Sequence, residues 1–429
     1  MSKHFTFSAL FFFGSLLLQA QDTTGVDKLH YPQLVSAFYT LINQQSFWLN
    51  NTQSSSLRKG LINVIASAAY WALDANDYHN KELHRLAGIS FAEINAVNAK
   101  RCELVFTDAA ISFFKDLYEG SNNKAGYDEL SPKDREIDKR IVLNRLIALC
   151  NGISFEDIIC SLEPATTDYI VLKKEYQQQS AKHDSLNLLQ LKRALNYLRW
   201  INHFRLTKYI VVNIPSATLN YYQADTVALT MNVVVGKPST QTPRFAAYCD
   251  KIILYPYWNV PPSIALNELL PLFKKEPGLL SAMNMQVLDN SGNIVDTSKL
   301  NWSAYTKYNF PYRFRQSTGC DNSLGIMKFN LTDPFTVYMH DTNYKPSFHS
   351  KSRFYSHGCI RVEKPLMLAN LILPAPIDSS FVESCLKDEK PVELDLINPV
   401  PVFVIYNTVG VNANNNVVYY KDVYNLNKK

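Results

Sequence analysis

The spacing of hydrophobic residues changes along the chain, from helical in residues 30–180 to strand-like beyond Tyr209. In the first part, apolar residues recur at intervals of four and three, which is typical of one face of an amphipathic helix: Leu57, Leu61, Val64, Ala68 and Trp71. We expect residues 30–180 to be helical. No residue pattern within them points to chemistry, so we interpret this region as a scaffold or a binding surface.

Capping and turn residues predict where several helices begin and end. A serine followed by proline at 131–132 opens a helix that stops near the Asn-Gly pair at 151–152. Ser154 caps another helix, which Pro164 ends. A further helix at about 186–200 leads into the second part of the chain.

Short β-branched and aromatic runs, bounded by Pro, Gly and Asn, follow Tyr209. They predict strands at 209–214, 227–235, 251–255, 326–330, 335–339, 401–406 and 417–420. A long interruption separates Pro262 from Gly325, with a helical piece at 264–275 and a turn at 289–292. We therefore expect a mainly β domain that carries an insertion, which is either decoration or a lid.

Composition bounds the class of protein without naming a function. The chain has 429 residues, of which 47% are hydrophobic and 19% charged, so it is globular and long enough for two or three domains. Its net charge of +5 is small for this length and gives no argument for binding nucleic acid.

The first twenty residues read as a secretion signal. Lys3 supplies a positive start, the apolar run extends from Phe5 to Leu18, and Ala20 ends a cleavage site before Gln21. The alternative is a retained membrane anchor, but the run is shorter than the ~20 apolar residues that span a bilayer. No later segment has the length and hydrophobicity of a span, so we expect an exported protein of the periplasm or cell envelope.

Seven cysteines leave at least one thiol unpaired in an oxidising compartment, unless a bridge forms between molecules. Cys359 is the natural free one. Pairing among the other six stays open, and all six could equally be buried thiols: Cys102, Cys150, Cys160, Cys249, Cys320 and Cys385.

The residues with the clearest chemistry are Ser356-His357-Gly358-Cys359-Ile360-Arg361, preceded by His340. A thiol nucleophile needs a nearby base and hydrogen-bond donors for an oxyanion, and this stretch offers Cys359 with either histidine as the base. Two alternatives are a purely structural cysteine and a zinc site. Zinc favours close ligand pairs such as Cys-x-x-Cys or His-Glu-x-x-His, which the chain lacks.

The spacing of His340 from Ser356-His357-Gly358-Cys359 resembles the signature of the L,D-transpeptidase (YkuD) catalytic domain. Further stretches are similar to the large, YcbB-like branch of that family, at 233–238, 257–265, 338–342 and 359–365. The resemblance covers residues 200–429 strongly. Residues 30–180 resemble, more weakly, the helical scaffold domain of the same branch.

The resemblance implies a multidomain fold class: an all-α N-terminal scaffold, then a mainly β, YkuD-like catalytic domain with an inserted capping subdomain. We expect the boundaries at 1–20 for the signal peptide, 21–185 for the scaffold and 186–429 for the catalytic domain, with the insertion at about 263–325. Larger relatives often carry a small peptidoglycan-binding module between the two domains. The polar stretch at 176–187 leaves no room for one.

The reaction implied by the resemblance is acyl transfer on peptidoglycan stem tetrapeptides, without metal or cofactor. The cysteine attacks the carbonyl of the third residue, a diamino acid, D-Ala leaves, and the side-chain amine of a second stem resolves the thioester into a 3→3 cross-link. Such an enzyme takes part in cell-wall synthesis and cell shape and is a carbapenem target. Other partners would be proteins of cell-wall synthesis.

By the same resemblance, Cys359 is the nucleophile and His340 the general base. The N–H groups of Gly358 and Cys359 are expected to form the oxyanion hole, while Ser356 and His357 support the loop. Arg361 is expected to bind a substrate carboxylate.

Two aromatic residues, Trp258 and Tyr338, are expected to line the cleft. Three other functions stay open: an L,D-carboxypeptidase that uses water as the acceptor, a non-catalytic cell-wall-binding protein, and a zinc peptidase of the cell wall. The sequence does not decide among a second stem, water, a lipoprotein or a free D-amino acid as the acceptor.

Overall fold

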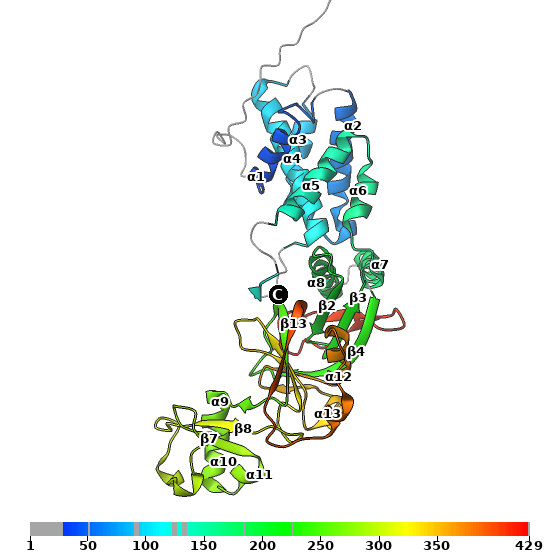
Figure 1. Ribbon diagram of the computed structural model, residues 1–429. Coiled ribbons are helices and arrows are strands. Elements are labelled where there is room, and N and C mark those ends of the chain that lie inside the picture. Colours follow the sequence, from blue (N-terminus) through cyan, green and yellow to red (C-terminus); the bar gives the residue numbers. More distant parts are fainter. Residues whose placement is uncertain are drawn as a thin grey trace, which may run out of the picture. The chain divides into compact units, whose positions relative to one another are not determined.

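The computed structural model describes residues 29–49, 52–89, 94–121, 127–130, 135–182, 185–224 and 226–427 (Figure 1). The expected signal peptide, residues 1–20, lies outside these ranges. The chain divides into a first unit, Met1–Asn123, Lys133–Phe204 and Ala413–Val417, and a second unit, Lys124–Pro132, Arg205–Asn412 and Val418–Lys429. The boundaries that the sequence suggests, at residues 185 and 186, remain a prediction.

The first unit is helical, as expected. Its helices are α1 (Pro32–Leu41), α2 (Thr52–Ala66), α3 (Asn80–Ala87), α4 (Ala96–Glu119), α5 (Glu136–Cys150), α6 (Phe155–Leu162), α7 (Thr167–Lys182) and α8 (Ser185–Asn202), with 3₁₀ turns η1 (Ala68–Trp71) and η2 (Ala75–Tyr78). None of the helices among the described residues is both long and apolar enough to cross a bilayer.

Local signals set several of these helix ends. Ser154 caps α6, since its hydroxyl accepts the N–H of Asp157 at 3.1 Å. The apolar stripe from Leu57 extends past α2, which ends at Ala66, into the separate turn η1. The predicted cap at 131–132 lies outside the described residues.

Helix α4 is the centre of the unit. Asn95 caps it by accepting the N–H of Asn98 at 2.8 Å, and the helix ends at Gly120, whose φ of 78° favours glycine. Every side chain from Cys102 to Phe114 is buried. Helices α1, α2, α3, α5 and α6 contribute buried residues to the same core, so this core follows helix α4.

The second unit is built on a sheet that closes on itself. Its strands are β1 (Tyr127–Asp128), β2 (Lys208–Asn213), β3 (Thr218–Gln223), β4 (Thr226–Gly236), β5 (Phe245–Leu254), β9 (Met327–Leu331), β10 (Met339–His340), β11 (Phe354–Ser356), β12 (Ile360–Val362) and β13 (Val392–Ile405). Nine of them follow the order β1-β5-β13-β2-β3-β4-β12-β10-β9, in which β9 pairs again with β5, and β11 pairs with β4 beside this path. A small ribbon pairs β14 (Val409–Val411) with β15 (Val417–Tyr419).

Alternation along the strands separates a core face from an outer face. Met339 and Ile360 are fully buried in the core, beside helix α12 (Pro365–Ile372) and the short α13 (Ser379–Glu383). The neighbours His340 and Arg361 therefore project from the opposite face of the sheet. This outer face is where the candidate site lies.

One predicted strand is wrong over most of its length. The run at 335–339 forms a strand only at Met339, because Asp333 accepts the N–H groups of Phe335 and Val337 and Thr336 has a φ of 56°. A local side-chain turn thus replaces ladder pairing there.

The insertion forms a subdomain with its own core and a three-stranded sheet, β6 (Trp258–Asn259), β8 (Arg313–Gln316) and β7 (Met285–Leu288). Its helices are α9 (Pro262–Ile264), the π-turn η3 (Ala265–Leu269), α10 (Leu270–Lys275) and α11 (Leu279–Ala282), with 3₁₀ turns η4 (Thr297–Lys299) and η5 (Trp302–Ala304). The expected helical piece and turn are present, the latter closed by the Gly292 N–H donating to Asp289 at 3.1 Å. The predicted fold class is confirmed.

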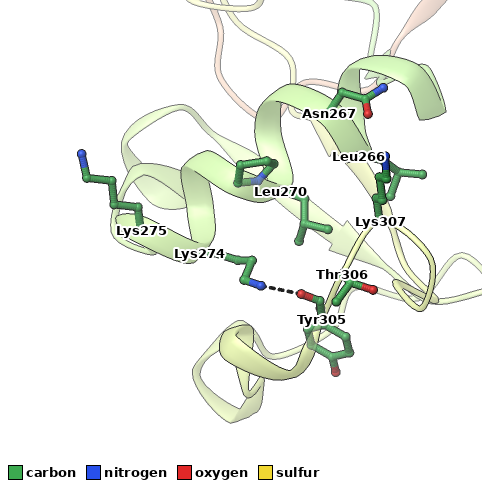
Figure 2. Close-up of a pocket in the computed structure, with 9 residues that line it drawn as sticks. Leu266, Asn267, Leu270, Lys274, Lys275, Tyr305, Thr306 and Lys307 are labelled. Carbon is green, nitrogen blue, oxygen red and sulfur yellow. Dashed lines mark hydrogen bonds between the residues drawn. The ribbon is translucent and has the colours of Figure 1, made fainter.

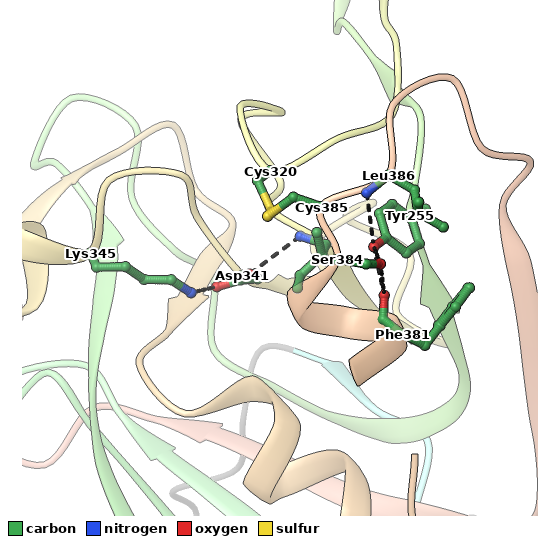
Figure 3. The surroundings of a disulfide bond; sticks show 9 residues. Tyr255, Cys320, Asp341, Lys345, Phe381, Ser384, Cys385 and Leu386 are labelled. Atoms are coloured by element: carbon green, nitrogen blue, oxygen red, sulfur yellow. Dashed lines mark hydrogen bonds and ion pairs between the residues drawn. A yellow bond between two sulfur atoms is a disulfide. The ribbon is translucent and has the colours of Figure 1, made fainter. Parts of the chain in front are cut away.

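A disulfide between Cys320 and Cys385 joins the end of the insertion to the segment after α13 (Figure 3). Beside it, the hydroxyl of Tyr255 donates to the carbonyl of Phe381 at 2.7 Å and accepts the N–H of Leu386 at 3.2 Å. Cys359 is among the free thiols, as expected.

We predict that Gly236→Ala destabilises the second unit. A Cβ on Gly236 would lie 2.2 Å from the carbonyl oxygen of Thr240, and that backbone has to move to accept it. The free energy of unfolding should fall by roughly 1–3 kcal/mol, measured as a lower urea midpoint. Gly278→Ala is the control, since nothing lies within 4 Å of its Cβ position. Equal midpoints for the two variants would contradict the prediction.

Candidate active site

The parallel pairing of β10 with β12 brings the expected histidine and cysteine onto one face. His340 lies opposite Arg361, and the N–H of Ile360 donates to the carbonyl of Tyr338 at 3.1 Å. Cys359, one residue before β12, is therefore level with Tyr338. Because side chains two residues apart share a face, the side chains of residues 338, 340, 359 and 361 all project from the outer side of the sheet.

The loop that carries the cysteine is fixed by its own hydrogen bonds. The hydroxyl of Ser356 donates to the carbonyl of Cys359 at 2.7 Å and accepts the N–H of Gly358 at 3.1 Å. Thr242 donates to the carbonyl of Gly358 at 2.7 Å, and the φ of 121° at Gly358 favours glycine. In this arrangement the Gly358 N–H is engaged, whereas that of Cys359 has no acceptor among the described residues.

The thiol of Cys359 lies among groups that hydrogen-bond to it. Burial raises its pKa, while the backbone and hydroxyl of Tyr338, which both donate to the sulfur, and the ammonium of Lys328 act to lower it. Trp258 bonds in turn to the hydroxyl of Tyr338, whose own pKa is raised by burial and by the neighbouring sulfur. The two aromatic residues expected to line the cleft thus form a chain that ends at the thiol.

The ring of His340 is held in one tautomer. Its Nδ1 lies 2.5 Å from the carbonyl of Asp341, which can only accept, so Nδ1 carries the proton in the neutral ring. The backbone of Leu324 is a second hydrogen-bond partner of the ring. Burial, followed by the nearby charge of Arg361, lowers the pKa of His340 to about 3. The imidazole is therefore neutral and can act as a base.

The turn at Gly325 and Ile326 holds the carboxylate of Asp341, the residue after His340. This carboxylate accepts the N–H of Ile326 at 3.2 Å and pairs with Lys345. A Cβ on Gly325 would lie 2.4 Å from the same carboxylate, so the close approach requires glycine, and its φ is 61°. Figure 3 shows this ion pair beside the disulfide.

The second histidine of the motif faces a different partner. His357 is exposed, and its Nε2 lies 2.8 Å from a carboxylate oxygen of Glu268, in the π-turn η3 of the insertion. Its ring is thereby tied to the insertion. The contact fits the supporting role that the sequence suggests for His357, which remains a prediction.

Arg361 is a partly buried cation. Its Nε is buried and has no acceptor, and its guanidinium lies 5.9 Å from the ring centre of Tyr355. Burial lowers the pKa of the guanidinium, as expected for a cation without a counter-charge. Among the described residues, no carboxylate forms an ion pair with it. The group is thus available to an anion from outside the protein.

Sequence reasoning missed Lys328. It lies on β9 directly opposite His340, and its ammonium lies 4.4 Å from the ring centre of Tyr338. Burial lowers the pKa of Lys328, while the charges of Cys359 and Glu393 act to raise it. A lysine in a strand of alternating apolar residues reads as a solvent-facing position, and only the register of β9 with β10 brings it to the site.

A separate hollow of roughly 670 Å³ lies within the insertion (Figure 2). Its lining combines apolar and basic side chains: Leu266, Asn267, Leu270, Pro271, Lys274, Lys275, Tyr305, Thr306 and Lys307. Lys274 is engaged, since its ammonium donates to the carbonyl of Tyr305 at 2.6 Å. The lining contains none of the residues around Cys359.

Two family models match the chain. Residues 207–393 match the model described as the L,D-transpeptidase catalytic domain (YkuD), and residues 33–175 match the model described as a scaffold domain. A protein of Haemophilus influenzae named "Putative L,D-transpeptidase" is 35% identical over 221 residues, which are 51% of this chain and 45% of that protein. The chain thus spans about half the length of this curated relative.

Solved structures of L,D-transpeptidases are much less similar to this chain in sequence and in superposition. A mutant of the Enterococcus faecium enzyme is 14% identical, with 50% of this chain and 62% of that chain covered and a TM-score of 0.23. The enzyme from Mycobacterium smegmatis is 14% identical, with 46% of this chain and 58% of that chain covered and a TM-score of 0.20. Superpositions this poor carry no argument.

We predict that Lys328→Met makes the thiol of Cys359 harder to ionise. The ammonium of Lys328 favours the thiolate, against burial and the charge of Asp333, so its loss should shift the pH profile of iodoacetamide alkylation toward higher pH. Lys328→Arg keeps the charge and should keep the profile. Lys351→Met, at an exposed site, is the second control. An unchanged profile in Lys328→Met would refute this role.

Proposed function

This chain carries a YkuD-type L,D-transpeptidase catalytic domain together with a helical scaffold domain, and we propose that it is a cysteine acyltransferase that cross-links peptidoglycan stem peptides. The observation that supports this most is the alignment of Cys359 and His340 on one face of β10 and β12, with a neutral imidazole held in the tautomer of a base. We further propose that the chain acts in the cell envelope after export.

In the first step, the sulfur of Cys359 attacks the carbonyl carbon between the third residue of a stem tetrapeptide and its terminal D-Ala. The thiol proton passes to Nε2 of His340 and from there to the leaving nitrogen of D-Ala. A C–S bond forms, the C–N bond breaks, and an acyl-thioester remains. The N–H of Cys359 is the donor best disposed to stabilise the oxyanion, since that of Gly358 is bonded to Ser356.

In the second step, the side-chain amine of a second stem attacks the thioester. Its proton passes to His340 and then to the departing sulfur, so that the C–N bond of a 3→3 cross-link replaces the C–S bond. The base is regenerated at the end of the cycle. Trp258 and Tyr338 line the approach to the sulfur, and their hydrogen bonds hold it in position.

Substrate binding also explains how so weak a base becomes effective. The charge of Arg361 is one reason that the pKa of His340 is low. A stem carboxylate bound to the free guanidinium would offset that charge and raise the affinity of the imidazole for a proton. In this proposal, the base gains strength only when substrate is in place.

Two alternatives from different classes remain, and a zinc peptidase is a third. Water in place of the amine would make the protein an L,D-carboxypeptidase, and an inert thiol would make it a cell-wall-binding protein. A zinc ion would need side chains that converge, whereas Cys359 bonds to Tyr338 and His357 to Glu268. These contacts favour thiol chemistry.

The direct test is to incubate the purified protein with disaccharide-tetrapeptide and weigh the products. Transfer gives a dimer that has lost one D-Ala, hydrolysis gives free tripeptide, and a binding protein leaves the substrate intact. Cys359→Ala should reduce dimer formation by about 10³-fold or more, because the nucleophile is lost. Cys160→Ala, at an exposed free thiol of the first unit, should have no effect. Dimer at the normal rate in Cys359→Ala would exclude the mechanism.

A second prediction assigns the base. Loss of a general base costs ~10²–10⁴-fold in rate, so His340→Ala should slow single-turnover acylation by a carbapenem on that scale. His357→Ala removes a supporting hydrogen bond worth ~1 kcal/mol, about fivefold.

Intact-mass spectrometry of the covalent adduct measures both rates. Glu268→Ala is the matched control, because it removes the other half of the same contact and should resemble His357→Ala. A larger loss at His357 than at His340 would reverse the assignment.

A further inference from the structure

Three side chains of the types that bind metal ions converge in the first unit. His30 lies just before α1, His79 lies between η2 and α3, and Asp108 lies in α4. Their ligand atoms all lie within 4.8 Å of one another. The three residues are far apart in sequence, so their spacing does not predict a metal site.

The two imidazole rings face the same carboxylate. Nε2 of His79 lies 2.7 Å from Oδ2 of Asp108, and the rings of His30 and His79 stack with centroids 4.5 Å apart and an interplanar angle of 24°. His79 has a φ of 54°, an uncommon conformation for a residue other than glycine, which its neighbours must hold in place.

The carboxylate itself is rigidly held. Asp108 is fully buried, and its oxygens accept the backbone N–H of His30 at 2.9 Å and that of Tyr31 at 2.8 Å. The hydroxyl of Ser112 lies 3.4 Å from Nδ1 of His30. An anchored carboxylate and an oriented imidazole are the surroundings that ordinarily support a metal ligand.

The group is open to solvent on one side. His30 is exposed, which gives a cation a direct path from solvent.

We propose that His30, His79 and Asp108 bind a divalent cation, with zinc the best match to two imidazoles and one carboxylate. For Nε2 of His79 to bind the ion, the hydrogen that it shares with Asp108 has to move to Nδ1 of the same ring or leave to solvent, so that two neutral imidazoles and one carboxylate face the ion. Zinc holds such ligands at about 2.0–2.2 Å in a tetrahedron. The ligand atoms that lie farthest apart therefore have to move closer together. The exposed ring of His30 is the part that moves. Water takes the fourth position.

Such an ion would tie the start of α1 to α3 and α4. An ion pair between His79 and Asp108 explains only why the ring of His79 lies beside the carboxylate. A cation bound by all three side chains also explains why the ring of His30 lies there. The site would stabilise the scaffold rather than take part in acyl transfer, and it is independent of the proposed function.

The test is to titrate the full chain, first freed of metal with a chelator, with Zn²⁺ by calorimetry and with Co²⁺ by absorption. One equivalent should bind, Co²⁺ should show tetrahedral bands without a thiolate charge-transfer band, and zinc should raise the melting temperature. His30→Ala should weaken binding by about 100-fold or more. It leaves the His79–Asp108 pair and the backbone bonds of residue 30 intact, so its fold should persist.

His84→Ala, an exposed histidine of α3, is the matched control and should bind like the unaltered chain. Circular dichroism confirms that each variant is folded. Absence of binding by the unaltered chain, equal binding by His30→Ala, or a thiolate band that assigns the ion to cysteine would each overturn the proposal.

Discussion

The candidate site depends on the parallel pairing of two very short strands, β10 and β12. Two parallel strands cannot be joined by a tight turn, so the chain between them must cross over, and it does so through residues 341–359. The register that results sets the histidine level with the arginine and the cysteine level with Tyr338. A shift by one residue would turn His340 into the core and Met339 toward the sulfur.

Two cations beside the thiol, Lys328 and Arg361, form no ion pair with a carboxylate among the described residues, although the charge of Glu393 acts on Lys328. An uncompensated, half-buried charge lowers stability, and proteins retain it mainly where an anion arrives from outside. Asp108 in the scaffold is the reverse case, since its charge is met by an imidazole and two backbone N–H groups.

Local signals in the sequence predicted the class of fold and most of the candidate site residues. The motif around Cys359 predicts thiol chemistry, because it places a cysteine near two histidines. Short β-branched and aromatic runs predict strands such as β2 and β4. Helix α4 lies in the region predicted to be helical, but its bounds were not predicted, because it is buried along its whole middle and shows no single apolar stripe. Lys328 and the group around Asp108 were missed for another reason, because contacts made by strand register and helix packing leave no trace in residue spacing.

The closed sheet limits how a peptide can be recognised. Because β9 pairs with both β10 and β5, the described strands that flank the thiol have their backbone groups already matched. A substrate chain therefore cannot pair with β9 or β10 as an added strand, which is how many peptide-binding domains gain affinity without regard to side chains. Recognition must rest on side chains and loops instead. Selectivity would then follow from charges and aromatic faces, and it would change by single substitutions rather than by remodelling the fold.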